Sequence, residues 1–198
     1  MGTMKKNRNL FLILAIVFTV VFCGWATLRI VKYVQFNLGC EAYLKRAADS
    51  NTIELAKGEL TKAIDYIEQN NLTDGIVSIF LKNPANDMGF WHTNIKSAYD
   101  ELNNLPEDAS QLEKTNVLMK LRESLTDRDD NGGTKVIFPQ GLEIYPNNAA
   151  YFWLAALSCA ALCLFWTLFG IAAGIQAGAN FQMKVTTITR KPDDKSGD

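Results

Sequence analysis

An acidic stretch late in the chain has the spacing of oxygen ligands in a calcium loop. Asp127, Asp129 and Asn131, followed by Gly132, match the pattern D-x-[DN]-x-[DN]-G. Alternate oxygens in such a loop converge on one cation, and the glycine permits the sharp turn between them. The closing acid is missing, because the twelfth position is Phe138. The sequence therefore predicts no bound metal and no cofactor, and the three oxygen-bearing residues remain a candidate calcium loop only.

His92 is the single histidine, and catalysis by a histidine would have to involve it. A nucleophile–base pair or a zinc site would need Cys40, or carboxylates from separate elements, to approach it. Beside Trp91 on an expected helix, His92 is interpreted more simply as a surface or half-buried polar residue. Cys40 is the one cysteine between the apolar stretches, so we expect it to be buried, with pairing between two chains as the alternative. We predict that the protein is not an enzyme.

Small residues recur at steps of three and four along the last apolar stretch. We name them the small-residue seam: Ala156, Ala160, Cys163, Thr167, Gly170, Gly174 and Gly178. In lipid, the close approach of backbones across small residues is a main source of helix association. Seven small residues without a bulky one among them therefore predict a helix-packing surface. A candidate partner face lies in the first apolar stretch: Ala15, Thr19, Cys23 and Ala26.

Two apolar stretches of membrane-spanning length hold these residues. Leu10–Leu28 contains nineteen residues and 144–183 contains forty, and neither has a charged residue or a histidine. A helix needs about 20 apolar residues to cross the bilayer core. We expect transmembrane helices at 10–28 and 150–176. The lack of ionisable groups at membrane depth argues against a pump or a transporter of charged substrates.

The first apolar stretch also has an interpretation as a signal peptide. A basic beginning, an apolar run and the small residues Gly24 and Ala26 fit a cleaved signal. Against cleavage, the run is long for the apolar core of a signal, and its small residues lie on one helical face, as in a packed helix. We expect the helix to be retained, and cleavage is the alternative.

Charge is distributed unevenly along a chain whose net charge is only −1. The first nine residues hold three basic side chains and no acidic one, whereas Arg29–Ala149 holds 13 basic and 18 acidic residues. Short basic tails stay in the cytoplasm, and long segments translocate largely regardless of their charge. We therefore expect cytoplasmic tails at 1–9 and 177–198 and an extracytoplasmic domain at 29–149. The acidic balance argues against nucleic acid as a partner.

Helical patterns dominate the segment between the apolar stretches. A break is expected at Gly39, followed by a helix over 41–69. An apolar stripe then recurs at alternating steps of four and three behind Asp87, a candidate N-cap: Trp91, Ile95, Ala98, Leu102 and Leu105. Ser110 and Glu113 form a capping-box pattern at the start of the next helix, whose expected core residues are Val117, Leu118, Leu121 and Leu125.

Extended structure is expected in two shorter places. Residues 75–81 form an apolar run that fits either a strand or a buried helix. Residues 136–138 and 142–145, joined by Pro139-Gln140-Gly141, predict a short β-hairpin.

Together these patterns predict a mainly α protein, in which two transmembrane helices flank a small extracytoplasmic helical bundle with a short β-hairpin. We expect a multi-pass protein of the cell membrane, with the bacterial inner membrane as the expected location and both termini in the cytoplasm. The expected function is that of an accessory, assembly or interaction subunit of a membrane complex. Its partners would be the lipid bilayer and either another membrane protein or further copies of itself. The alternative is a sensor-type domain that signals through a partner, an analogy that rests on layout alone.

Overall fold

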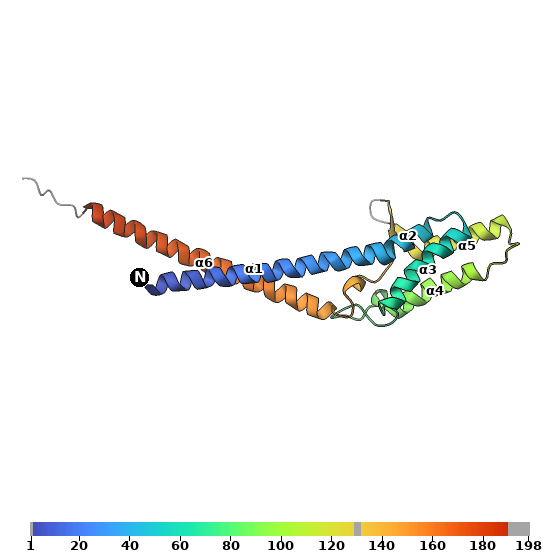
Figure 1. Cartoon of the computed structure of the whole chain (residues 1–198), viewed down its shortest axis with the longest axis horizontal. Coiled ribbons are helices and arrows are strands. Elements are labelled where there is room, and N and C mark those ends of the chain that lie inside the picture. The colour runs from blue at the N-terminus through green and yellow to red at the C-terminus, as the bar shows by residue number, and fades with distance from the viewer. Residues whose placement is uncertain (1, 129–131, 190–198) are drawn as a thin grey trace, which may run out of the picture. The chain divides into compact units, whose positions relative to one another are not determined.

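The computed structural model describes residues 2–128 and 132–189 and is mainly helical, with one small two-stranded sheet. The elements, in chain order, are α1 (Gly2–Phe36), η1 (Asn37–Glu41), α2 (Ala42–Ala48), α3 (Ile53–Gln69), η2 (Pro84–Asn86), α4 (Met88–Asn103), α5 (Gln111–Leu125), β1 (Thr126–Arg128), β2 (Thr134–Val136), η3 (Leu142–Ile144) and α6 (Asn148–Thr189). They form two compact units (Figure 1). We call residues 27–151 the interhelical domain, and the remaining parts of α1 and α6 the apolar helix pair.

Two helices in the described part of the chain are long and apolar enough to cross a membrane, as the sequence predicts. They run over Asn7–Ala48 and Asn148–Thr187. Both continue beyond the apolar stretches expected from the sequence. α1 passes Leu28 and becomes part of the interhelical domain, and α6 extends beyond residue 176.

The expected helix break at Gly39 is wrong. The helix continues through the π-helical turn η1 into α2, and the first break comes at Asp49, so the single helix expected over 41–69 is divided in two. Gly39 faces the ring of Tyr66 on α3, and a Cβ at this position would overlap that ring. The glycine therefore permits close packing between helices instead of ending one. Thr52 caps the start of α3, because its hydroxyl accepts a hydrogen bond from the Leu55 N–H at 3.3 Å.

The core of the interhelical domain lies between α2, α3, α4 and α5. The apolar stripe predicted on α4 is confirmed, since Trp91, Ile95 and Leu102 are buried and Ala98 and Leu105 pack against them. Cys40 is fully buried, as expected. Other fully buried side chains come from α1, α2, α3, α4 and η3: Phe36, Leu44, Leu60, Ile67, Met88 and Leu142.

Local signals at the helix ends are also confirmed. The Asp87 carboxylate accepts a hydrogen bond from the Phe90 N–H at 3.0 Å and so caps α4. Ser110 and Glu113 form a complete capping box at the start of α5. These contacts satisfy N–H groups that the first turn of a helix leaves without an internal acceptor.

The β-hairpin lies one segment earlier than expected. β1 pairs antiparallel with β2, so that Thr126 is opposite Val136. The predicted second strand is instead the 3₁₀ turn η3, which follows Gly141 at φ 91°. Pro139 has no N–H to donate to a ladder, which explains why strand pairing does not continue through it.

The apolar run at 75–81 is neither a strand nor a helix. Ile76 forms an isolated bridge with Asp87, and the Val77 N–H donates to the Asn86 carbonyl at 3.0 Å. These contacts close the base of a projecting loop. We call residues 78–82 the apolar loop.

Replacing Trp91 with alanine tests the core of the interhelical domain. Trp91 is 7% exposed, and its indole N–H donates to the Ile137 carbonyl at 2.8 Å. We expect Trp91→Ala to lower the unfolding free energy of a fragment covering 27–151 by about 3–5 kcal/mol, the usual cost of emptying a large aromatic site. Urea denaturation followed by circular dichroism measures it. Leu112→Ala is the control, since Leu112 is 71% exposed and should change stability little.

Candidate interaction site

One face of α6 packs against α1 within the apolar helix pair. The rings of Phe18 and Phe165 stack with centroids 5.5 Å apart. The Trp166 indole N–H donates to the Thr19 hydroxyl at 3.2 Å, a polar contact between the helices. Ser158, on the same side of α6 as Phe165, is 2% exposed. The chain's own α1 therefore already occupies this side of α6.

A second polar contact joins the other ends of the two helices. The Arg8 guanidinium donates to the Gln176 side-chain oxygen at 2.7 Å. Arg8 lies two residues before the first apolar stretch, and Gln176 is the last residue of the second expected transmembrane segment. The two expected membrane boundaries on this side are thus brought together.

The small-residue seam lies on the uncovered side of α6. All seven of its residues are exposed, and a Cβ added at Gly170, Gly174 or Gly178 would meet no atom within 4 Å. At 3.6 residues per turn, Gly174 is rotated by about 160° from Ser158, so the seam faces almost directly away from α1. Whether the seam packs against another helix stays a prediction, and the chain's own first helix is not its partner in this structure.

The candidate partner face on α1 is only partly used by α6. Ala15 is fully buried, and Thr19 and Ala26 are half-buried. Cys23 is exposed. α1 also meets α6 through a residue that is larger than the sequence pattern suggested, because Phe18 stacks on Phe165.

A groove of about 790 Å³ opens on the interhelical domain. Apolar side chains from two segments form much of it: Phe90, Trp91 and Ile95 from α4, and Ile137, Phe138 and Pro139 from the segment after β2. Amide, hydroxyl and carboxyl groups complete the lining, from Asn83, Asn86, Asp87, Asn94, Ser124 and Gln140. This combination of apolar walls with a few polar groups, and this volume, are usual for small-molecule sites.

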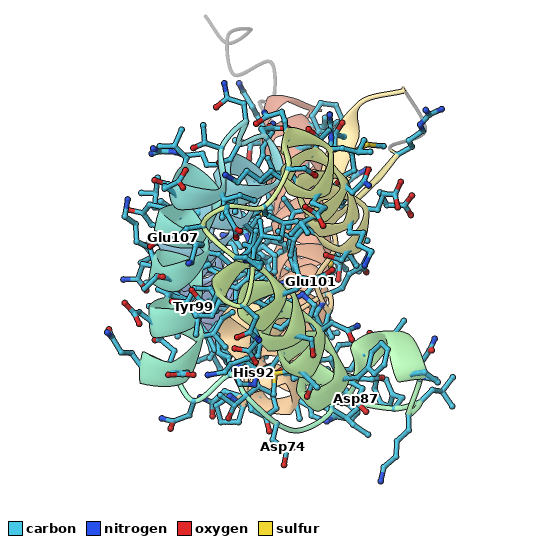
Figure 2. The ribbon with its side chains drawn as sticks, turned by 90° about the vertical axis from the view of Figure 1, so that its right-hand side faces the viewer. Asp74, Asp87, His92, Tyr99, Glu101 and Glu107 are labelled. Atoms are coloured by element: carbon cyan, nitrogen blue, oxygen red, sulfur yellow. The ribbon has the colours of Figure 1, made fainter. Side chains whose placement is uncertain are left out.

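Two contacts fix the shape of the groove. The hydrogen bond from Trp91 to the Ile137 carbonyl joins its two walls. The Phe138 ring packs against Phe36 with centroids 5.0 Å apart, which holds the second wall against the end of α1. Asp87 lies at the start of α4 (Figure 2), and its carboxylate already caps that helix.

Sequence reasoning did not identify the groove or the apolar loop beside it. A signal for the groove was present. Phe90 and Trp91 are adjacent on one helix and point about 100° apart, so they could not both belong to the buried stripe. The run at 75–81 had no helical or strand periodicity, so the sequence pattern assigned it to neither kind of element. In the structure Phe90 is 65% exposed.

His92 is half-buried on α4 and does not form a catalytic constellation with the described side chains around it. Its Nε2 atom lies 3.9 Å from the Glu68 carboxylate, and Lys96 also contacts Glu68 at 3.3 Å. Burial lowers the pKa of His92, an effect that Lys96 reinforces and the Glu68 charge opposes. Cys40 lies in the core instead of beside His92.

The candidate calcium loop is described only in part. Asp127 lies in β1, where its carboxylate accepts a hydrogen bond from the Arg128 N–H at 2.7 Å. Asp129 and Asn131 lie outside the described residues. Across residues 2–128 and 132–189, no group of three or more His, Cys, Asp or Glu side chains is arranged to hold a metal ion.

Comparisons with protein-family models, curated proteins and solved structures find no match to this chain.

The half-buried position of His92 predicts a contribution to acid sensitivity. Its folded-state pKa lies below the unfolded value, so the unfolded chain binds more protons as the pH falls. The stability due to neutral His92 is therefore present above the unfolded pKa and is lost as the pH falls through the folded pKa. We expect wild type to lose more thermal stability than His92→Gln between about pH 7 and about pH 5. Equal losses in differential scanning fluorimetry would contradict this assignment.

Proposed function

We propose that this chain is a non-enzymatic membrane protein that acts as an accessory or assembly subunit of a membrane complex. In this proposal both apolar helices cross the membrane, and the interhelical domain binds a partner outside the cytoplasm. One observation carries the proposal. The small-residue seam of α6 faces away from α1 and is uncovered, while α1 occupies another side of the same helix.

The physical reason is the weakness of other forces between helices in lipid. Lipid tails are as apolar as leucine, so association depends on close packing and interhelical hydrogen bonds. A helix whose only task was to anchor the chain would gain nothing from a continuous row of small residues on its exposed side. A second transmembrane helix, from a partner protein or another copy, fits that row because its backbone approaches closely across the glycines.

The orientation follows from the charges at the ends of the apolar stretches. Positively charged residues near the N-terminus favour the cytoplasmic side. Arg8 contacts Gln176 near the far end of the second apolar stretch, which supports two boundaries at one membrane face. The interhelical domain, with its acidic balance, then lies on the opposite side. The bacterial inner membrane remains the expected location.

The groove favours a second candidate function, that of a sensor domain. Its volume of about 790 Å³ suits a small molecule, and its lining combines aromatic rings with amide groups. Binding there would change the contact between α4 and the segment after β2, which also touches α1 through Phe138. Such a sensor would signal through a partner protein, which again requires a contact surface on the helices.

Purification in mild detergent distinguishes the two functions. A subunit should retain a protein partner in a fixed ratio. A sensor should retain a small molecule, detected by mass spectrometry after denaturation, and Phe90→Glu should abolish that retention because Phe90 lines the groove. Since Phe90 is largely exposed, this substitution should leave the fold intact.

The membrane topology is tested by labelling cysteines in intact cells. Native Cys40 is buried, so an exposed probe is needed on the interhelical domain. We expect Leu112→Cys to react with a membrane-impermeant thiol reagent, because Leu112 is exposed on α5 and its domain faces outward in the proposal. Ser196→Cys should react only after the membrane is opened. Reaction of Ser196→Cys in sealed cells would show that the proposed orientation is wrong.

The seam is tested by adding bulk to it. Gly174→Leu should weaken association with a co-purifying helix by on the order of 1–2 kcal/mol, because the added side chain prevents close backbone approach. Leucine is favourable at membrane depth, so insertion itself should be unaffected. Förster transfer between labelled proteins in vesicles, or recovery of the complex, measures the change.

Two controls separate the seam from the rest of α6. Leu164→Ala changes an exposed side chain away from the seam and should have little effect. Phe165→Ala should loosen the contact with α1 and leave association with the partner largely intact. If Gly174→Leu has no more effect than Leu164→Ala, the seam is not an association surface.

A further inference from the structure

The loop between α3 and α4 displays apolar side chains instead of burying them. Leu81 is 79% exposed, Phe80 is 66% exposed and Ile79 is 36% exposed. Lys82 follows them and is also exposed. Three consecutive apolar residues and a lysine at the tip of a projecting loop are unusual in contact with water alone, because exposed apolar patches generally mark a contact surface.

The base of this loop is held to the domain by packing and backbone hydrogen bonds. Val77 is 2% exposed and anchors one end in the core. The Met88 N–H donates to the Gly75 carbonyl at 2.9 Å, and the bridge between Ile76 and Asp87 closes the loop beneath its tip. Figure 2 shows Asp74 and Asp87 at the two ends of the loop. The tip is therefore held out from the domain.

The loop base touches the segment from which α6 begins. Gly75 packs against the Tyr145 side chain, and a Cβ at Gly141 would lie 3.2 Å from a Val77 methyl carbon. The Asn148 side chain, in the first residue of α6, donates to the Gly141 carbonyl at 2.8 Å.

The first helix reaches the same segment. Arg29 immediately follows the first apolar stretch, and its guanidinium forms an ion pair with Glu143 at 2.6 Å. Residues 141–148 thus contact the end of one apolar stretch, the start of the other and the base of the loop. Because Tyr145 and Ala149 are only four residues apart, the part of the loop base that touches Tyr145 is held within about 15 Å of the residue that precedes the second expected transmembrane segment.

We propose that the apolar loop, residues 78–82, inserts into the interfacial region of the same bilayer that the two apolar helices cross. The inference rests on the proposed membrane-spanning function. Leucine and phenylalanine would enter the boundary between head groups and acyl chains, where apolar side chains of peripheral proteins are buried. Lys82 would extend its charged end toward the head groups, as long basic side chains do at this depth. The partner is lipid, and the loop forms a third membrane contact.

The charges around the loop favour a neutral lipid surface over a strongly anionic one. Asp74 lies at the loop base and is exposed, which offsets the attraction of Lys82 for anionic head groups. Insertion would therefore depend on apolar burial more than on lipid charge, and zwitterionic phosphatidylcholine vesicles are the appropriate probe.

The test uses the full-length protein reconstituted into phosphatidylcholine vesicles. A polarity-sensitive fluorophore is attached to Leu81→Cys in a background carrying Cys23→Ala, Cys159→Ala and Cys163→Ala, while Cys40 stays in place because it is fully buried. The matched control is Leu112→Cys, a similarly exposed leucine position on α5. Leu112 follows the end of α4 that is remote from the loop. Since α4 alone is about 24 Å long, the control label lies far from the loop.

Insertion predicts a blue-shifted emission from the Leu81 label and strong quenching by lipids that carry a nitroxide high on the acyl chain. The Leu112 label should show neither. Equal emission and quenching at the two positions would overturn the proposal. A blue shift that grows with the protein-to-lipid ratio and lacks nitroxide quenching would also overturn it, because that result indicates contact between proteins.

A third label separates failure of this inference from failure of the proposed function. The fluorophore is placed on Leu164→Cys, an exposed position of α6 that is not part of the seam, with Cys23→Ala, Cys159→Ala and Cys163→Ala, and is tested with lipids whose nitroxide lies deep in the bilayer. Quenching at position 164 without quenching at position 81 would refute only the loop insertion. No quenching at position 164 would show that α6 does not cross the bilayer, so both proposals would fail.

Discussion

The ion pair between Arg29 and Glu143 is the constraint on which the interhelical domain depends. It joins the first residue after one apolar stretch to the segment just before the other, so it closes the domain at the point where both ends of its chain leave it. Glu143 is 8% exposed at its side chain, and an acidic group so far from water needs a positive partner. Phe36 adds to this closure, because its ring packs against Phe138 and Tyr66. α1 is therefore a structural part of the domain as well as a candidate membrane helix.

This closure explains how a small domain keeps several candidate contact surfaces separate. The core lies between α2, α3, α4 and α5, and the groove lies between α4 and the segment held by Phe36. The apolar loop projects near the chain's connection to α6. Each surface is thus built on an element that the core or the Arg29 contact already fixes, which lowers the entropy that binding would otherwise cost.

α6 likewise has two sides with different contacts. Bulky rings and the Trp166–Thr19 hydrogen bond hold α1 on one side. Small residues occupy the side that remains uncovered. In lipid, bulky side chains can fill the space between two helices, whereas glycine brings their backbones together. A single helix can therefore pack against one neighbour through aromatic side chains and present a different kind of surface to another.

The sequence by itself determined those features that depend on neighbours a few residues away. Apolar length identified both long helices, the stripe through Trp91 and Leu102 identified the buried side of α4, and Ser110 with Glu113 identified the start of α5. Helix periodicity and end-capping involve residues within one or two helical turns, so they can be recognised in the sequence alone.

Only the tertiary structure decided what distant residues do to each other. Gly39 looks like a helix break until Tyr66 is placed against it, and Leu142–Ile144 looks like a strand until Gly141 and Pro139 direct the chain into a turn. The seam could be recognised in sequence, but which side of α6 meets α1 could not, because small and aromatic faces are both compatible with helix packing. The physical reason is common to all three cases: the free energy of a residue in these positions is set by contacts with segments far along the chain, and no local pattern records them.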